Sequence, residues 1–318
     1  MTDQIKDKIR GVIFGQAIGD AIGLGTEFMT QAMVQHYYPD GITEYAQILQ
    51  DKHRKRWKPG EWTDDTNQML CILDSILANK RVDVKDIALT LVDWAHNDGR
   101  GLGRTVYSVL GSPIFMQKPQ EAAKEYWEKS NRYATANGAV MRTSVLGIWE
   151  YNKPEKIRIN ATRVCKITHY DPRCVGSCVI VCLMISFLLQ GLTDIEQLAS
   201  RLMTEGDIFD DRIRPYLKEH VRANIEALNL GEKDSIGYTL KTLSAGFWAL
   251  QHATSYESGI SSIIHQGGDA DTNAAVAGAI LGARFGYDAL PARWLEGLHR
   301  KDWLMDQANQ LIDLVSPA

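Results

Sequence analysis

The sequence predicts an all-α fold. Apolar residues recur at steps of three and four along most of the chain, which is typical of helices with one buried face, whereas alternating strand patterns are nearly absent. The interruptions are short segments rich in Gly, Pro, Asn or charge, and none looks like an interdomain linker. Since 318 residues with 45% hydrophobic composition can bury a large core, we expect one compact domain over residues 1–318.

The helical pattern can be followed along the chain in order. The segments with the clearest spacing are 69–77, 86–97, 138–150, 163–170, 194–203, 213–228 and 237–253. Breaks are expected at 39–45, 53–62, 97–103, 111–119, 152–155 and 228–235. We find no convincing repeat of the length used by helical solenoids, which favours a single bundle.

The overall charge excludes some classes of partner. With 35 basic against 39 acidic residues, the chain has no global field that would attract nucleic acid or an anionic membrane, so an anionic ligand needs a local site. The N-terminus does not resemble a signal peptide, and the apolar segment 179–189 is too short to cross a bilayer. We therefore expect a cytoplasmic protein without a membrane partner, and a nucleic-acid partner is disfavoured but stays open.

The five cysteines point to a reducing compartment, because their number is odd and four of them lie in or near one apolar segment. Cys174, Cys178 and Cys182 recur every four residues and would share one helical face. A thiolate metal site and ordinary core packing are both compatible with this spacing. Core packing is favoured, because zinc sites usually have shorter cysteine spacings.

The stretch GEWTDDT, residues 60–66, places two acids directly before an apolar-periodic segment. Thr63, Asp64 and Asp65 suit a helix N-terminus, where oxygen atoms accept free backbone N–H groups and negative charge interacts well with the helix dipole. Capping needs only one such residue, however. The presence of a second acid therefore needs another explanation.

A second stretch of the same kind lies near the other end of the chain. In HQGGDADTNAAVAGAILG, Asp269, Asp271 and Thr272 again stand before a helix, and its many Gly and Ala residues permit close packing against a neighbour. If the two helix starts meet, four carboxylates converge and must take up protons or bind cations. Oxygen donors without His or Cys suit Mg²⁺, Mn²⁺ or Ca²⁺, and four acids can hold a pair of ions. Each cluster alone is better explained as a cap; the two together favour a metal site.

A third stretch, GQAIGDAIGLGTEFM, has glycines every four residues, which indicates a helix packed tightly against a partner. The turn that follows would deliver Glu27 to a defined place. An exposed acid after a helix is the simpler interpretation of Glu27.

Together these segments resemble the ADP-ribosylglycohydrolase family. The matching stretches are GQAIGDAIGLGTE at 15–27, WTDDT at 62–66, NGAVMR at 137–142, TH at 168–169 and GGDADTNAA at 267–275. They occur in family order over nearly the whole chain, and GTEFMT is most similar to the bacterial branch with dinitrogenase reductase-activating glycohydrolase. No ligand position is missing, which argues against a non-catalytic member.

The resemblance implies an all-α orthogonal bundle of many helices with a site for two divalent cations, Mg²⁺ or Mn²⁺. The residues that match the family's ligand groups are Thr63, Asp64, Asp65, Asp269, Asp271 and Thr272. Glu27 matches the acid near the metals and the distal ribose. For catalysis, we expect Glu27 or one of the metal-site acids Asp64 and Asp269 to transfer the proton.

The implied reaction removes ADP-ribose from a modified side chain. Cleavage at the anomeric carbon passes through an oxocarbenium-like centre, and the metals would grip the ribose hydroxyls and orient or acidify a water. The GTEFMT match favours an arginine linkage on protein, so the partner would be an ADP-ribosylated protein or a smaller ADP-ribose conjugate. We expect the enzyme to act as a monomer.

The rest of the ligand needs other contacts, and several residues are candidates. Asn137 and Gly138, followed by a helical pattern, suggest a helix start that suits an anion or ribose. His169 matches a His near the pyrophosphate in some relatives, although a structural role fits equally well. Gly101 and Gly103 lie in GRGLGRT, which loosely resembles a loop that closes over the ligand. Asp98 would meet a guanidinium leaving group or, more simply, form a turn.

The basic segment KHRKRWKPGEW offers two interpretations. Its five Lys and Arg residues with Trp57 and Trp62 would steer a phosphate-bearing target or stack on a base, whereas a simply solvated loop is the more common case. Four functions therefore remain open: hydrolysis of ADP-ribosyl-arginine, hydrolysis of serine-linked or other ADP-ribosyl conjugates, a metal-dependent phosphoesterase, and a non-catalytic ADP-ribose-binding or immunity module.

Overall fold

Helices form nearly all the regular structure of the protein. The computed structural model describes residues 1–316. Its fifteen α-helices are α1 (Asp3–Gly23), α2 (Gln31–Tyr37), α3 (Asp64–Asn79), α4 (Val84–Asn97), α5 (Arg104–Leu110), α6 (Pro119–Lys129), α7 (Pro154–Cys165), α8 (Pro172–Leu189), α9 (Ile195–Gly206), α10 (Ile213–His220), α11 (Thr239–His252), α12 (Tyr256–Ile264), α13 (Ala270–Phe285), α14 (Ala292–Gly297) and α15 (Lys301–Val315). Residues 1–316 contain one isolated β-bridge and no strand, which confirms the predicted all-α fold.

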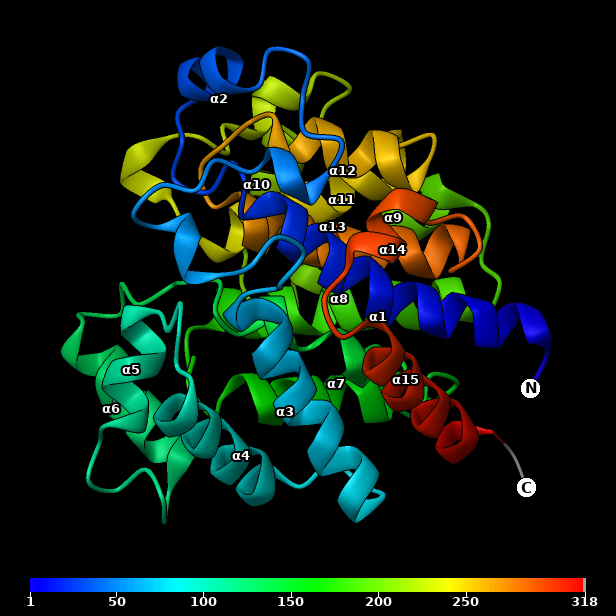
Figure 1. Ribbon diagram of the computed structural model, residues 1–318. Helices are drawn as coiled ribbons and strands as arrows, with labels where there is room; N and C mark the ends of the chain where they lie inside the picture. Colours follow the sequence, from blue (N-terminus) through cyan, green and yellow to red (C-terminus); the bar gives the residue numbers. More distant parts are fainter. Residues whose placement is uncertain (317–318) are drawn as a thin grey trace.

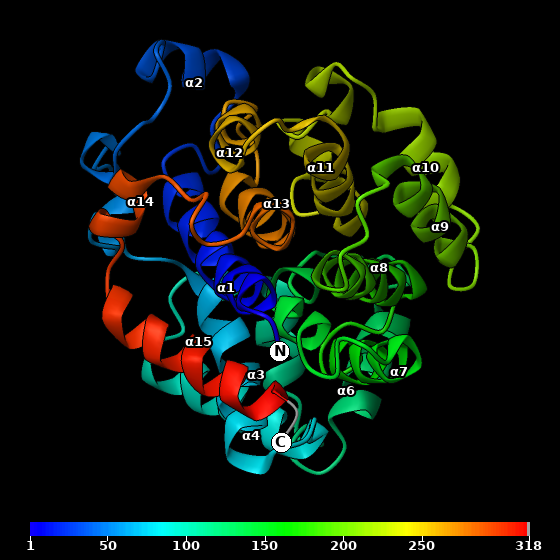
Figure 2. The same cartoon turned by 90° about the vertical axis from the view of Figure 1, so that its right-hand side faces the viewer.

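The first long helix and one near the end of the chain, α1 and α13, lie side by side in the middle of the molecule (Figures 1 and 2). A Cβ added to Gly15 would lie 2.3 Å from the carbonyl oxygen of Gly278, and one added to Gly278 would lie 2.2 Å from that of Gly15. The two backbones therefore touch, which only glycine permits. The same close approach recurs at Gly19 against Ala274, so the C-terminal half of α1 is held beside the start of α13.

The most apolar helix, α8, is a core helix. It has 18 residues and a mean hydropathy of 2.1, so by length and composition it would be able to cross a membrane, contrary to the expectation from segment 179–189. In the structure, however, 89% of it is buried within the protein, against α7, α9, α11 and α13. Cys174, Cys178 and Cys182 are all buried on this helix, and burial raises the pKa of the Cys174 and Cys182 thiols. Their environment agrees with core packing.

Most predicted helical segments fall within observed helices, but three differ. Segments 69–77, 86–97, 194–203 and 237–253 lie in or overlap closely with α3, α4, α9 and α11. The prediction for 163–170 was wrong beyond Cys165, where α7 ends before Pro172 opens α8. The prediction for 213–228 was wrong after His220, where α10 ends.

The largest correction concerns segment 138–150. It forms two short 3-10 helices, Val140–Arg142 and Ser144–Gly147, instead of an α-helix. Residues 139–148 are buried on all sides, and Arg142 and Ser144 direct their polar groups to partners elsewhere in the core. Periodicity cannot separate such a fully buried segment from an α-helix.

Candidate active site

A cavity of about 830 Å³ opens on the side of the molecule where the starts of α3 and α13 come together. Its lining comes mainly from the Glu27 turn, the starts of α3, α5 and α13, His169, and the segments 101–103, 133–138 and 234–238. The volume lies within the range of small-molecule and cofactor sites. Of the residues predicted to bind cations or ADP-ribose, all except Thr63 line this cavity, whereas the alternative candidate Asp98 does not.

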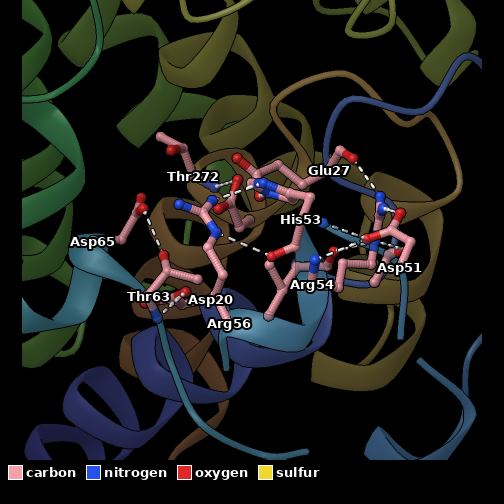
Figure 3. Close-up of polar contacts among 12 residues, drawn as sticks. Asp20, Glu27, Asp51, His53, Arg54, Arg56, Thr63, Asp65 and Thr272 are labelled. Atoms are coloured by element: carbon pink, nitrogen blue, oxygen red, sulfur yellow. Dashed lines mark hydrogen bonds and ion pairs between the residues drawn. The ribbon is translucent and has the colours of Figure 1, made fainter. Parts of the chain in front are cut away.

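The start of α3 is capped by a carboxylate from another helix. Asp20 of α1 accepts hydrogen bonds from the backbone N–H groups of Thr63 (2.9 Å) and Thr66 (3.0 Å) and from the Thr66 hydroxyl (2.6 Å). Thr63 is the N-cap residue, as expected, but its hydroxyl donates to Asp65 at 3.2 Å instead of capping the helix (Figure 3). Asp64 and Asp65 are thereby free of the capping role and available to a ligand.

The start of α13 is positioned by a glycine turn. Gly267 and Gly268 both have positive φ angles, and an added Cβ would lie 2.2 Å from the Met29 carbonyl oxygen and 2.1 Å from the Leu230 carbonyl oxygen, respectively. Gly268 donates to the Met29 carbonyl (2.9 Å) and its own carbonyl accepts from Phe28 (2.6 Å). This pairing holds the Glu27 turn against Asp269, the N-cap residue of α13.

The two helix starts meet, as the sequence predicted. One carboxylate oxygen each from Asp20, Asp65 and Asp271 lie within 4.8 Å of one another, and so do oxygens from Glu27, Asp269 and Asp271. Asp271 therefore belongs to both triads and links them. The two triads form one acidic cluster that draws on α1, α3, α13 and the Glu27 turn.

The acidic cluster and Asp64, which lines the cavity but belongs to neither triad, carry more buried negative charge than the protein neutralises. Burial, opposed in part by hydrogen bonds, raises the pKa of Asp20 and of Asp269 to about 6. Burial and then the neighbouring carboxylates raise the pKa of Asp64, Asp65 and Asp271 well above the usual range. Within residues 1–316, no Lys or Arg forms an ion pair with any of these five acids. Such a site calls for cations or protons.

The donor set fits a hard divalent cation. Asp65 Oδ1 is buried and has no hydrogen-bond partner, although it belongs to a carboxylate in the middle of the cluster. Carboxylate and hydroxyl oxygens are the ligands that Mg²⁺, Mn²⁺ and Ca²⁺ prefer. The chemistry of the cluster thus agrees with a cation site and excludes a zinc site of the Cys/His type.

A buried polar chain supports the α3 side of the cluster. The Gln68 amide donates to Asp64 Oδ2 at 3.0 Å and accepts from Arg142 Nη1 at 2.8 Å. Arg142, which is fully buried, also donates to the Thr168 hydroxyl oxygen at 2.7 Å, and this oxygen lies 2.8 Å from His169 Nδ1. The start of α3 is therefore connected to the His169 side of the cavity.

His169 lines the cavity as a neutral side chain. Burial and then the Arg142 charge lower its pKa to about 3. Since Arg142 can only donate to Thr168, the Thr168 hydroxyl proton is free to go to His169 Nδ1, which leaves the ring proton on Nε2. Nε2 has no partner within the protein and can donate to a ligand.

The remaining predicted contacts also lie around the cavity. The Asn137 amide donates to Asp269 Oδ2 (2.6 Å) and to the Thr242 hydroxyl (2.9 Å), so it supports the α13 side. A Cβ on Gly138 would lie 3.1 Å from the His169 ring. The expected α-helix start at Asn137 and Gly138 is wrong, because a 3-10 helix follows at Val140.

Loop residues 101–103, directly before α5, lie on the α3 side of the cavity. Gly101 has a φ of +86°, and an added Cβ would lie 2.2 Å from Asp64 Oδ1, so only glycine fits against this carboxylate. Gly103 lines the cavity as the N-cap residue of α5. Asp98 does not line the cavity; it forms an ion pair with Arg100 at 2.6 Å, in agreement with the turn interpretation.

Sequence reasoning missed several residues that shape the site. Asp20 is the most important, and its signal was a single acid within an apolar, glycine-spaced helix. Arg142 was noticed only as part of the stretch NGAVMR, and Gln68 gave no signal, because charged and amide residues within helical patterns are usually exposed. In the basic segment, Trp57 and Trp62 are only 3% exposed, so they are not available for stacking on a base.

Fold and site together define an all-α protein with a cavity that is lined by an acidic cluster. The acids of this cluster come from segments far apart in the sequence. The model of the ADP-ribosylglycohydrolase family matches residues 1–318, and the chain belongs to this family. The resemblance found in the sequence is thereby confirmed.

Characterised relatives have related activities in their names. The chain is 28% identical over 284 residues to ADP-ribosyl-[dinitrogen reductase] glycohydrolase of Rhodospirillum rubrum, which covers 86% of this chain and 84% of the relative. It is 25% identical over 260 residues to ADP-ribosylarginine hydrolase Tri1 of Serratia proteamaculans (80% and 68%) and 25% identical over 297 residues to ADP-ribosylhydrolase ARH3 of Danio rerio (80% and 78%). A solved chain described as an ADP-ribosylglycohydrolase-related protein complex superimposes with a TM-score of 0.74 at 25% identity, over 99% of this chain and 100% of that chain.

Proposed function

We propose that this protein is a divalent-cation-dependent hydrolase that releases ADP-ribose from modified arginine side chains of proteins. The family acts on ADP-ribose conjugates, and its members among the relatives include hydrolases of this kind. The observation that carries the proposal is an acidic cluster that lines a cavity large enough for a nucleotide-sized ligand. A purely structural cluster would have been paired with Lys or Arg.

The cation ligands of this proposal come from both helix starts. The residues that would hold two Mg²⁺ or Mn²⁺ ions are Thr63, Asp64, Asp65, Asp269, Asp271 and Thr272, and Asp20 lies in one triad with Asp65 and Asp271. Such ions would neutralise the carboxylates, bind ribose hydroxyls and make a water more acidic.

The protein's own residues then orient the substrate and move the proton. Glu27 lines the cavity beside Asp269 and Asp271, where its carboxylate is in place to accept a proton from the attacking water or to return one to the leaving group. His169 Nε2 would donate a hydrogen bond to an acceptor oxygen of the ligand. Gly101 would let the ligand approach Asp64 closely.

The arginine linkage rests on three supports. GTEFMT resembles the bacterial branch of the family, and two of the relatives are named for arginine or for dinitrogen reductase as the substrate. In addition, the six carboxylates at the site outnumber the four positive charges of two divalent cations, and the remaining negative charge would attract a guanidinium leaving group, which is a cation.

Incubation with ADP-ribosyl-arginine and ADP-ribosyl-serine peptides, each with Mg²⁺ or Mn²⁺ and with a chelator, tests the proposal. We expect cation-dependent release of free ADP-ribose, faster from the arginine peptide. Faster release from serine would reassign the linkage, and release of inorganic phosphate or AMP would replace the glycosidic reaction by a phosphoesterase. Tight binding of ADP-ribose without any turnover would leave a binding module.

A further inference from the structure

The candidate proton-transfer group, Glu27, is in contact with a histidine from the basic segment. His53 Nε2 lies 2.5 Å from Glu27 Oε2 (Figure 3). This inference rests on the proposed function. We propose that His53 is a positioning residue that fixes the orientation of the Glu27 carboxylate at the edge of the acidic cluster and so keeps it available for proton transfer.

The state of the His53 ring follows from its second neighbour. Arg56 Nη2 lies 2.7 Å from His53 Nδ1, and a guanidinium can only donate. Nδ1 must therefore accept, which leaves the ring proton on Nε2, where it is donated to Glu27. Arg56 is itself held in place, because its Nε donates to the His53 carbonyl at 3.0 Å and its guanidinium lies 4.4 Å from the ring centroid of the buried Trp57.

The same segment also holds the backbone of the Glu27 turn. Arg54 is 4% exposed, and its Nε lies 3.0 Å from the carbonyl oxygens of Leu24 and Gly25. Its Nη2 donates to the carbonyl of Glu27, and Asp51 balances its charge. Arg54 therefore fixes the turn, while the neighbouring His53 fixes the side chain that the turn carries.

Without such an anchor, the Glu27 carboxylate would not stay where it is. One of its oxygens lies within 4.8 Å of oxygens of Asp269 and Asp271, so like charges repel it when the acidic cluster is empty and bound cations would attract it when the cluster is filled. A hydrogen bond from His53 opposes both movements. The backbone adds to this restraint, since Phe28 is held at a φ of +59° by its hydrogen bond to Gly268.

Two replacements of His53 separate positioning from packing. His53→Phe keeps a ring between Phe28 and Trp57 but removes the donor, whereas His53→Gln keeps a donor close to the position of Nε2. At saturating Mg²⁺, we expect His53→Phe to lower kcat for ADP-ribosyl-arginine by about 10- to 100-fold with little change in KM, because a mispositioned base loses most of its contribution. His53→Gln should recover kcat to within about threefold of the wild type. Lys55→Ala, an exposed neighbour, is the matched control and should behave like the wild type.

Calorimetric titration with Mg²⁺ distinguishes this role from a general loss of structure. We expect His53→Phe to bind Mg²⁺ at least as tightly as the wild type, because a released Glu27 can turn toward the cations. A wild-type kcat in His53→Phe, an equal loss in His53→Gln, or weaker Mg²⁺ binding in His53→Phe would each overturn the proposal.

The contact can also be tested without any turnover. In the metal-free protein at a pH of about 8, ¹⁵N NMR of labelled histidine should show His53 with its proton on Nε2, assigned by the loss of that signal in His53→Gln. A proton on Nδ1 would overturn the inference. If the wild type hydrolysed neither peptide, the proposed function would fail, whereas this spectrum would still decide the Glu27 contact.

Discussion

At the start of α3, side chains position the acids. Asp20 from α1 accepts hydrogen bonds from the free backbone N–H groups, and the Gln68 amide donates a hydrogen bond to Asp64. At the start of α13, the backbone does most of this work, because Gly268 pairs with Met29 and α1 packs directly against the helix. The α3 start supplies Asp65, and the α13 start supplies Asp269 and Asp271, to one acidic cluster.

The difference shows that similar local sequences can be positioned in the same site by different kinds of contact. Support by side chains is sensitive to each hydrogen-bonding partner, since an unpaired buried donor costs about 1–3 kcal/mol. Support by glycine contacts depends on the close approach of two helices, so replacing the acids should not disturb it. Replacements on the two sides should therefore separate loss of stability from loss of function.

The largest effect is expected from the acids that line the cavity. Asp64→Asn and Asp269→Asn should each lower kcat for ADP-ribose release by about 10³-fold or more, because each removes a charge that the cations need. Circular dichroism should show an unchanged helix content. Asp306→Asn, at an exposed position on α15, is the control. Full activity in either cavity variant would contradict a cation site built from both helix starts.

A smaller effect is expected from Gln68 and Asn137, whose side-chain amides donate hydrogen bonds to Asp64 and Asp269. Gln68→Met and Asn137→Leu should each weaken Mg²⁺ binding by about 10- to 100-fold, as loss of a partner that orients a ligand usually does. At saturating Mg²⁺, only Asn137→Leu should also raise KM, since Asn137 lines the cavity and Gln68 is fully buried. Calorimetry and steady-state kinetics measure the two effects. A raised KM in Gln68→Met would show that the α3 side reaches the substrate.

The two threonines test the stability side of the comparison. Thr66→Val removes the hydroxyl that donates to Asp20 and should lower the free energy of unfolding by about 1–2 kcal/mol. Thr272→Val, in the first turn of α13, should lower it less and instead weaken activity, because Thr272 lines the cavity. Urea unfolding in the presence of a chelator measures both. The reverse order of stabilities would mean that the α13 start is the side held by side chains.

The smallest effect is a pH dependence of the metal-free protein. Burial raises the pKa of Asp20 and Asp269 from 3.8 to about 6, so at higher pH the folded state carries the full cost of both charges. As the pH falls from about 7.5 to about 5.5, the folded state takes up protons before the unfolded state, which should stabilise it by about 1 kcal/mol per group. Denaturant unfolding at the two pH values measures the gain. Asp20→Asn and Asp269→Asn should each lack the part of this increase in the free energy of unfolding that comes from the replaced acid. Saturating Mg²⁺ should abolish the increase in the wild type. An increase that persists with Mg²⁺ would show that other groups cause it.

The helix starts were predictable because their chemistry is local. Thr63 and Asp269 stand at N-cap positions in the structure, as their residue types predicted, although neither side chain caps its helix. The glycine spacing of α1 likewise predicted a close helix partner, since only glycine allows two backbones to touch. The meeting of the two acidic stretches could be inferred from charge, because two isolated clusters would each need no more than a cap.

The supports of the site were not predictable in the same way. Segment 138–150 has helical periodicity, yet it folds as 3-10 turns that direct the buried Arg142 to Gln68. His53 belongs to a charged segment that suggested a solvated loop, yet it contacts Glu27. In both cases the deciding contacts join residues far apart in the chain, and local periodicity and charge contain no information about such pairs.

The sequence by itself determined the all-α class, the family and the residues of the acidic cluster other than Asp20, because helix periodicity, capping chemistry and the family's acidic stretches are all local properties. Only the tertiary structure decided that Asp20 caps α3, that Arg142 and Gln68 support Asp64, and that His53 holds Glu27. The physical reason is that a buried polar group must find a partner among whatever side chains the packing brings within hydrogen-bond distance. That partner is chosen by how the helices pack.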